Sequence, residues 1–167
     1  GDGLVVARKL NAAGYQVVSW IIGSEAKLSL TCQEKLDLLR AGGIEPRFII
    51  AAELVGLVET TDFNDYDLII DAIIGIGSRG KLRDPLPQLL EQLNQSRAMR
   101  VALDIATGLN ADTGEVEDIA FKADLTTSFA LAKQGHFLAR GREYTGELLV
   151  IDIGIPAEFV AKAQKSK

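Results

Sequence analysis

The chain has 167 residues, a net charge of −5, 47% hydrophobic and 25% charged residues. This length suffices for one domain with a buried core, and the composition is typical of a globular protein. The negative charge disfavours nucleic acid and anionic membrane surfaces as partners, and one cysteine excludes an internal disulfide and suits a reducing compartment. With no signal-peptide pattern and no apolar run of bilayer length, the expected localisation is cytoplasmic, without a membrane partner.

Helical and strand patterns alternate along the chain. Residues 4–14 repeat apolar positions at helical spacing and stop at Gly14, a typical residue just beyond a helix end. Residues 29–43 repeat the pattern, with Ser29 as the N-cap and Gly42–Gly43 as the stop. Further helices are predicted at 51–60, 84–96 and 156–167, and strands at 15–22, 47–50, 66–74, 100–105, 123–130 and 146–155.

Strands separated by helices indicate βαβ units, a mostly parallel sheet and a three-layer α/β/α sandwich in one domain, residues 1–167. Ligands of such sheets bind beyond the carboxyl ends of the strands. We therefore expect four polar segments to share one edge of the sheet. They are residues 1–3, 71–81, 104–114 and 126–133.

The spacing of glycines in Gly75–Gly80 matches the dinucleotide-binding fingerprint GxGxxG. The fingerprint requires its third glycine in the opening turn of a helix. Here Pro85 and Pro87 disfavour helical backbone before Asp84, so the glycines are predicted to lie in an extended loop. The interpretation as a classical NAD(P)-binding oxidoreductase is therefore the weaker alternative.

A glycine loop with free N–H groups and nearby cations can bind an anion. Arg79, Lys81 and Arg83 supply those cations in this sequence. The alternative is a solvated surface loop with incidental charges, and for each single cation the two interpretations are about equally favoured.

Asp71 and Asp104 lie at the ends of apolar strands. A carboxylate in such a place is costly unless it is paired, hydrogen-bonded or bound to a cation. For Asp104 we favour a functional role over helix capping or a turn, whereas Asp112–Gly114 is predicted to be a turn. Asp71 with a threonine hydroxyl and backbone carbonyls could bind a hard cation. The only histidine, His136, is expected to be neither catalyst nor ligand.

Taken together, these segments resemble the family of NAD(P)H-hydrate epimerases, the YjeF N-terminal domain. The resemblance runs over the whole chain, with the motifs in order. The matching segments are GDGLVVAR at Gly1, DAIIGIGSRG at Asp71, LDIATGLNADTG at Leu103, ADLTTSFALAKQG at Ala123 and GELLVIDIGIP at Gly146.

The resemblance implies a Rossmann-like fold and an enzyme that interconverts the R and S epimers of hydrated NADH and NADPH (NADHX and NADPHX). It also implies a potassium ion, with Asp71 and Thr107 as ligands and Asp104 as the acid/base group in contact with substrate. The remaining substrate-binding residues that it implies are Asp2 and the phosphate loop Gly75, Ile76, Gly77, Ser78, Arg79, Gly80 and Lys81.

The sequence departs from the family pattern in two places. Ala106 replaces a proline of the usual DIPSG motif, and Thr107 replaces its serine but keeps the hydroxyl. The asparagines that precede Gly1 in the family are missing, so we expect an N-terminally truncated domain that lacks a central strand and need not be active alone.

A non-catalytic binding or scaffold module is the second candidate function, because the fold tolerates loss of chemistry. The resemblance also allows a homodimer and a dehydratase domain fused in the parent protein.

Overall fold

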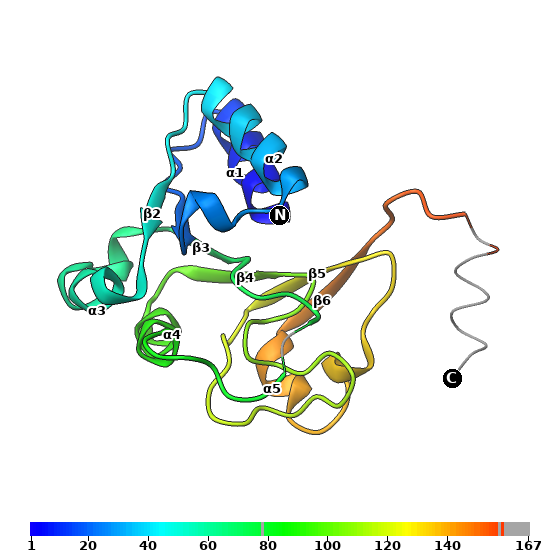
Figure 1. Ribbon diagram of the computed structural model, residues 1–167. Coiled ribbons are helices and arrows are strands. Elements are labelled where there is room, and N and C mark those ends of the chain that lie inside the picture. Colours follow the sequence, from blue (N-terminus) through cyan, green and yellow to red (C-terminus); the bar gives the residue numbers. More distant parts are fainter. Residues whose placement is uncertain (78, 157, 159–167) are drawn as a thin grey trace.

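The computed structural model describes residues 1–77, 79–156 and 158 (Figure 1). Its α-helices are α1 (Asp2–Ala12), α2 (Leu30–Ala41), α3 (Ala51–Thr60), α4 (Leu86–Gln95) and α5 (Gly141–Thr145). Its strands are β1 (Trp20–Ile22), β2 (Arg47–Ile49), β3 (Leu68–Asp71), β4 (Met99–Leu103), β5 (Leu125–Phe129) and β6 (Glu147–Ile151). Three short 3₁₀ turns are η1 (Glu25–Lys27), η2 (Phe63–Asp65) and η3 (Gln134–His136).

Every strand pairing among the described residues is parallel, as predicted. The strands form two sheets rather than one, with the orders β1-β2 and β3-β4-β5-β6. The register of the larger sheet places Asp71 of β3 beside Ala102 of β4, and Leu103 beside Thr127 of β5. The carboxyl ends of β3, β4 and β5 therefore lie next to one another.

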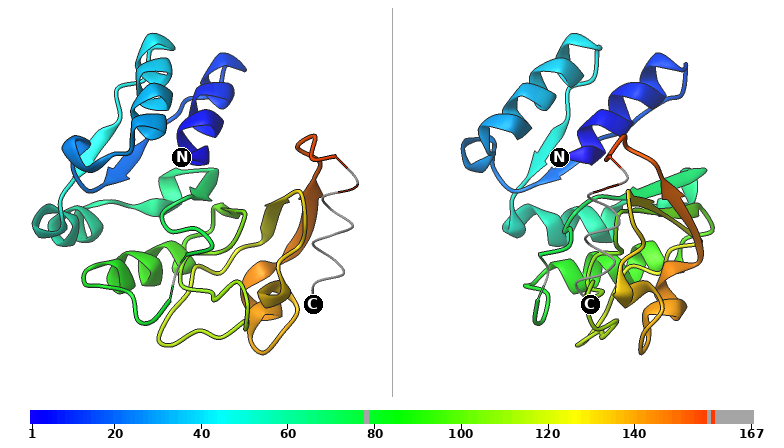
Figure 2. Two further views of the ribbon diagram at one scale, coloured as in Figure 1. Left: turned by 45° about the vertical axis from the view of Figure 1, so that its right-hand side comes forward. Right: turned by 90° about the vertical axis from the view of Figure 1, so that its right-hand side faces the viewer.

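Helices cover β1 and β2 on both faces, which gives the Rossmann-like three-layer arrangement. On one face, Ile21 and Phe48 pack against α1 and α2 through Leu39 and its neighbours. On the other face, Trp20 and Ile49 join the main core, which continues through α3 and α4 to β4. Figures 1 and 2 show α1 and α2 together on one side of the strands and α3 and α4 on the other.

The predicted helix ends are confirmed for the first two helices. Gly14 follows α1 with a φ of +91°, and Gly43 follows α2 with a φ of +87°, the left-handed region that favours glycine. The hydroxyl of Ser29 caps α2 by accepting a hydrogen bond from the Cys32 N–H at 3.3 Å. By contrast, α4 begins at Leu86 and not at Asp84, so that Pro87 rather than Pro85 lies in its first turn.

Several strands are shorter than predicted, and local hydrogen bonds explain two of the ends. Asp71 Oδ1 accepts the Ile73 N–H at 3.1 Å, and this turn ends β3 at Asp71. Asp152 Oδ1 accepts the Gly154 N–H at 2.8 Å just after β6. The predicted helix at 156–167 lies almost entirely outside the described residues.

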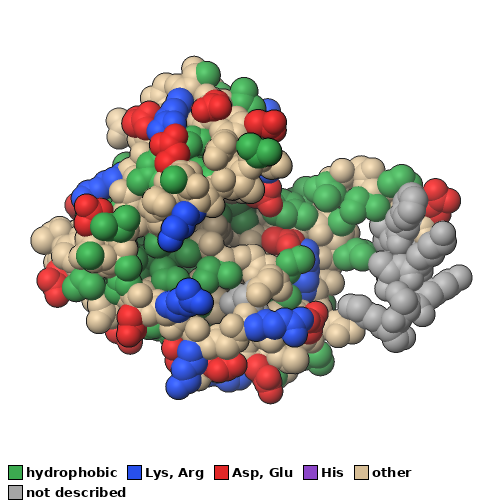
Figure 3. All heavy atoms as spheres, in the orientation of Figure 1, with side chains coloured by type: hydrophobic (Ala, Val, Ile, Leu, Met, Phe, Trp, Pro, Cys, Tyr) green, Lys and Arg blue, Asp and Glu red, His purple; other side chains and the backbone are tan. Residues whose placement is uncertain are grey.

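Hydrophobic side chains remain exposed around β6 and the segment after it, as the space-filling view shows (Figure 3). They belong to Leu149, Val150, Ile153 and Ile155. In the described part of the chain, no helix is long and apolar enough to cross a membrane.

Candidate functional site

Asp71 lies at the carboxyl end of β3 with 2% of its surface exposed. Thr107 binds it twice: the Thr107 N–H donates to Oδ2 and the Thr107 hydroxyl donates to Oδ1, each at 2.7 Å. The Thr107 hydroxyl oxygen in turn accepts the Ile74 N–H at 3.1 Å. The two residues that the family resemblance assigns to one cation are therefore in direct contact, and they are tied to the first residues after β3.

Burial raises the pKa of the Asp71 carboxyl above its ordinary value, against the opposing effect of its hydrogen bonds to Thr107 and Ile73. None of the ion pairs found among residues 1–77, 79–156 and 158 includes Asp71. A cation in contact with the carboxylate would offset the desolvation cost of its negative charge.

The atoms that could coordinate a cation beside Asp71 are oxygen atoms. They are the carboxylate, the Thr107 hydroxyl and the Ile74 carbonyl, whose oxygen is 3.5 Å from that hydroxyl. The described residues contain no cluster of three or more His, Cys, Asp or Glu side chains that could hold a metal ion. This donor chemistry fits a hard cation such as potassium and not a transition metal.

Asp104 follows β4 directly and has a φ of +67° in the left-handed region. A residue other than glycine is uncommon there, although Asp and Asn tolerate it best. Its N–H donates to the Thr127 carbonyl at 2.8 Å, and its Oδ1 accepts the Phe129 N–H at 2.9 Å. The backbone conformation therefore turns the carboxylate toward the end of β5.

Lys133 is the charged partner of Asp104, and its ammonium group donates to Asp104 Oδ1. It also donates to Ser128 Oγ at 3.0 Å and to the Phe129 carbonyl at 3.2 Å. These contacts can use all three ammonium protons, and they leave Asp104 Oδ2 without a hydrogen-bond partner in the described part of the chain. The side chain of Asp104 is 21% exposed, so the free oxygen belongs to a partly desolvated carboxylate.

His136, which was expected to be neither catalyst nor ligand, is buried beside Asp104. It is 1% exposed, and its ring contacts the Asp104 carbonyl and the Lys133 N–H. Only the tertiary structure brings these residues together, because 32 positions separate His136 from Asp104 in the chain.

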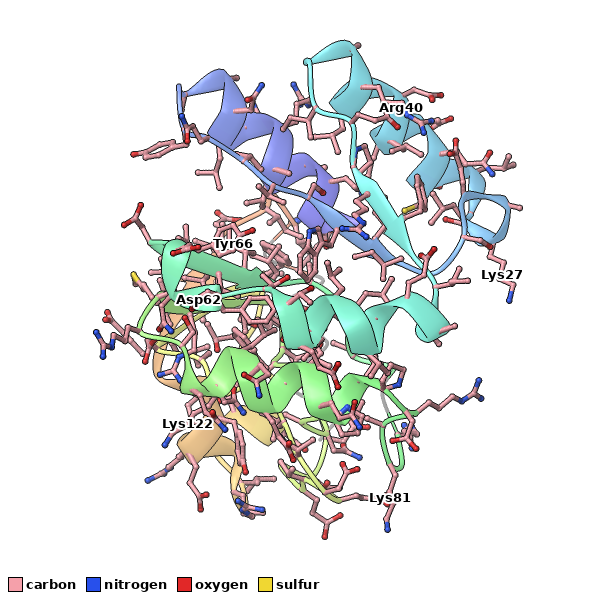
Figure 4. All side chains as sticks on the ribbon, turned by 90° about the vertical axis from the view of Figure 1, so that its left-hand side faces the viewer. Lys27, Arg40, Asp62, Tyr66, Lys81 and Lys122 are labelled. Atoms are coloured by element: carbon pink, nitrogen blue, oxygen red, sulfur yellow. The ribbon has the colours of Figure 1, made fainter. Side chains whose placement is uncertain are left out.

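The glycine loop is exposed at Gly75, Ile76, Gly77, Arg79, Gly80 and Lys81, and Ser78 lies outside the described residues. The loop borders a shallow hollow of about 230 Å³ that Arg79, Lys81 and Arg83 also line. Arg79 forms an exposed ion pair with Asp112 at 3.3 Å, and Lys81 extends away from the body of the molecule (Figure 4). As predicted, the glycines lie in an extended loop, since α4 starts only at Leu86.

Asp2 lies in the first turn of α1, and its Oδ1 accepts a hydrogen bond from Lys35 at 3.4 Å. The start of α1 packs against the segment after β3, because a Cβ at Gly3 would be 2.7 Å from the Cβ of Ala72. Three of the four predicted segments thus meet around Asp71 and Thr107. Asp104 forms its own cluster with Lys133 and shares no hydrogen bond with the described residues of the glycine loop.

Sequence reasoning missed Lys133 and Ser128 as parts of the Asp104 cluster. Both fall in the segment 126–133 that was expected at this edge of the sheet and in the matched motif ADLTTSFALAKQG, but neither was assigned a role. The feature of the sequence that could have indicated the ion pair is a lysine close to the strand that follows Asp104 in the chain.

The model of the family described as "YjeF-related protein N-terminus" matches residues 1–135. An NAD(P)H-hydrate epimerase from Elusimicrobium minutum is 35% identical over 97% of this chain and 72% of its own length. Another from Rhodopirellula baltica is 34% identical over 96% of this chain, which spans 64% of that relative.

A bifunctional NAD(P)H-hydrate repair enzyme Nnr from Archaeoglobus fulgidus is 40% identical over 95% of this chain, which spans only 31% of it. The crystal structure of the yeast protein YNL200c matches 96% of this chain with a TM-score of 0.75 at 22% identity, which shows the fold alone. With the family model covering residues 1–135 and these relatives covering nearly the whole chain, the chain belongs to the YjeF-related protein N-terminus family.

Proposed function

We propose that this chain is an NAD(P)H-hydrate epimerase, which interconverts the R and S forms of NADHX and NADPHX. The observation that carries the proposal is the Asp104 carboxylate, with Oδ1 held by Phe129 and Lys133 and Oδ2 left for a substrate. The names of the relatives agree with this activity.

The substrate determines what the carboxyl group must do. The hydrated ring carries a hydroxyl group on a carbon beside the ring nitrogen. At the start of the reaction the free oxygen, Oδ2, must carry a proton. When Asp104 donates this proton to that hydroxyl, the C–O bond breaks, water leaves, and the nitrogen lone pair forms a double bond to the carbon. The resulting cation is planar, so water can add to either face while Asp104 takes a proton back, and the other epimer forms.

Lys133 would stabilise the negative charge that remains on Asp104 after proton donation, because an opposite charge in contact favours the ionised form. All its ammonium protons have acceptors within the protein, namely Asp104, Ser128 and the Phe129 carbonyl. We therefore assign proton exchange with the substrate to Asp104 and positioning of its carboxylate to Lys133.

Asp71 and Thr107 would hold the potassium ion. The ion would supply a fixed positive charge that orders the start of the glycine loop, which is joined to Thr107 through the Ile74 N–H. The phosphates would bind the hollow beside this loop, where Arg79, Lys81 and Arg83 provide positive charge. Asp2 would complete the substrate site from the start of α1.

The test is conversion of purified R epimer to S epimer by the wild-type protein and by its Asp104→Asn variant. Asparagine tolerates the left-handed backbone and keeps an acceptor for Phe129 and Lys133, so the variant should fold. General acid/base catalysis contributes about 10²–10⁴-fold, and we expect a loss of that size. Asp67→Asn is the matched control, because Asp67 is exposed just before the opposite end of β3.

The epimerisation assay, calorimetry and a test for turnover of intact NADH together separate the candidate functions. Full epimerase activity in Asp104→Asn would contradict the role of Asp104. Calorimetry should detect binding of NADHX in preference to intact NADH. Turnover of intact NADH would favour the oxidoreductase, and no binding of either compound would favour the scaffold module.

A further inference from the structure

His136 occupies a buried position between the two charged residues of the site. Its Nδ1 is 3.2 Å from the Lys133 backbone nitrogen, and its Nε2 is 3.2 Å from the Asp104 carbonyl oxygen. A backbone N–H can only donate and a carbonyl can only accept. Both contacts are therefore satisfied only when Nδ1 carries the lone pair and Nε2 carries the proton, which defines one tautomer of the neutral imidazole.

The surroundings of the ring favour the same neutral state. Burial is the main effect that lowers the pKa of His136 below its ordinary value, and the charge of Lys133 lowers it further. The hydrogen bond to the Asp104 carbonyl and the Asp104 charge oppose this shift without reversing it. A protonated ring would also lose the acceptor that the Lys133 N–H requires.

These contacts link Asp104, Lys133 and His136 in a closed cycle of hydrogen bonds. The Lys133 side chain binds the Asp104 carboxylate, and His136 joins the Lys133 backbone to the Asp104 backbone. Asp104 has a φ of +67°, a conformation that costs free energy in a residue other than glycine. The bond from His136 Nε2 to the Asp104 carbonyl holds this conformation, which in turn sets the direction of Oδ2.

We propose that His136 is a positioning residue for the reaction: as a neutral imidazole of one tautomer, it fixes the backbone of Asp104 and so aims the free carboxylate oxygen at the substrate. This inference rests on the proposed epimerase function. It assigns no proton transfer to His136, whose two nitrogens are both engaged by the backbone.

Two variants separate the two hydrogen bonds of the ring. In His136→Gln, the amide nitrogen can take the place of Nε2 and donate to Asp104. In His136→Asn, the amide oxygen can take the place of Nδ1 and accept from Lys133, but the bond to Asp104 is lost. A displacement of about 1 Å can reduce the rate about 10²-fold, so we expect kcat of His136→Asn to fall by one to two orders of magnitude at nearly unchanged KM.

We expect His136→Gln to keep a kcat at least about tenfold above that of His136→Asn, because glutamine can still donate a hydrogen bond to the Asp104 carbonyl oxygen. Thr145→Val is the matched control for general damage. Thr145 is 3% exposed and donates to the Gly141 carbonyl at 2.8 Å, so its loss removes a buried hydrogen bond outside the Asp104 cluster. An equal loss of kcat in this control would overturn the positioning role.

Nitrogen chemical shifts of the His136 imidazole in the wild-type protein give a readout that does not depend on activity. A proton on Nε2 at neutral pH supports the inference, and a proton on Nδ1 or a charged ring overturns it. Wild-type turnover with equal kcat in both His136 variants would overturn the inference and leave the epimerase function standing. Absence of wild-type turnover would refute the epimerase function itself, and the positioning role with it.

Discussion

The Asp104–Lys133 ion pair offers a quantitative test of how far this site is removed from water. The two side chains are 21% and 18% exposed, respectively. Exposed pairs contribute about 0–1 kcal/mol, whereas breaking a buried pair costs about 3–5 kcal/mol. For a pair with about a fifth of each side chain exposed, we expect a coupling free energy of about 1–3 kcal/mol.

A double-mutant cycle with Asp104→Asn, Lys133→Met and the double variant measures this coupling. Asparagine keeps the left-handed backbone, and methionine keeps the apolar part of the lysine stem, so each change mainly removes one charge. Urea unfolding at pH 7 gives the free energy of unfolding of all four proteins, provided that their m-values agree.

The exposed pair Arg79–Asp112 serves as the control, since its side chains are 77% and 71% exposed and it should show no measurable coupling. High salt should reduce the Asp104–Lys133 coupling only slightly, because partly buried pairs are weakly screened. A coupling below about 0.5 kcal/mol would place the pair with ordinary surface pairs and refute the reasoning.

Three further predictions concern potassium, glycine and pH. The melting temperature should rise more in KCl than in LiCl of equal ionic strength, and Asp71→Asn should abolish the difference; an identical response of both proteins would contradict the cation site. Gly114→Ala should cost at least about 2 kcal/mol in urea unfolding, because Gly114 has a φ of +71° and its Cβ would lie 2.1 Å from the Leu138 carbonyl oxygen. A Cβ at Gly75 would have no non-neighbouring atom within 4 Å, so Gly75→Ala should leave the free energy of unfolding unchanged. Equal losses of stability in Gly75→Ala and Gly114→Ala would contradict this reasoning. The pKa of His136 is lower in the folded than in the unfolded state, so its contribution to stability is complete above the unfolded-state pKa of 6.5 and is lost as the pH falls below 6.5. The free energy of unfolding of His136→Gln should therefore fall less between pH 7 and 5 than that of the wild-type protein. Parallel pH profiles of the two proteins would refute this.

The sequence predicted the elements well where local chemistry decides them. Ser29 at the start of α2 and the glycines at the ends of α1 and α2 act through short-range hydrogen bonds and backbone angles, which depend on neighbouring residues alone. The extended glycine loop followed in the same way from two prolines. Helix α4 began two residues later than predicted, at Leu86, with Pro85 at its N-cap and Pro87 in its first turn.

Strand lengths and the division into two sheets were beyond the reach of local patterns. A strand lasts only as long as it has a partner, and β1 and β2 pair over three residues each. The apolar run that was predicted as a strand at 66–74 ends at Asp71, because the Asp71 carboxylate accepts the Ile73 N–H.

By itself the sequence determined the α/β class, the parallel pairing and the positions of Asp71 and Asp104 at strand ends, because each depends on residue type along or next to a strand. Thr107 was indicated by the family resemblance and not by a local pattern. Only the tertiary structure decided the partners of these residues. Lys133 and His136 reach Asp104 across 29 and 32 positions of sequence, through the pairing of β4 with β5. Such contacts depend on the packing of strands remote in sequence, and this packing is what holds one oxygen of Asp104 and leaves the other free.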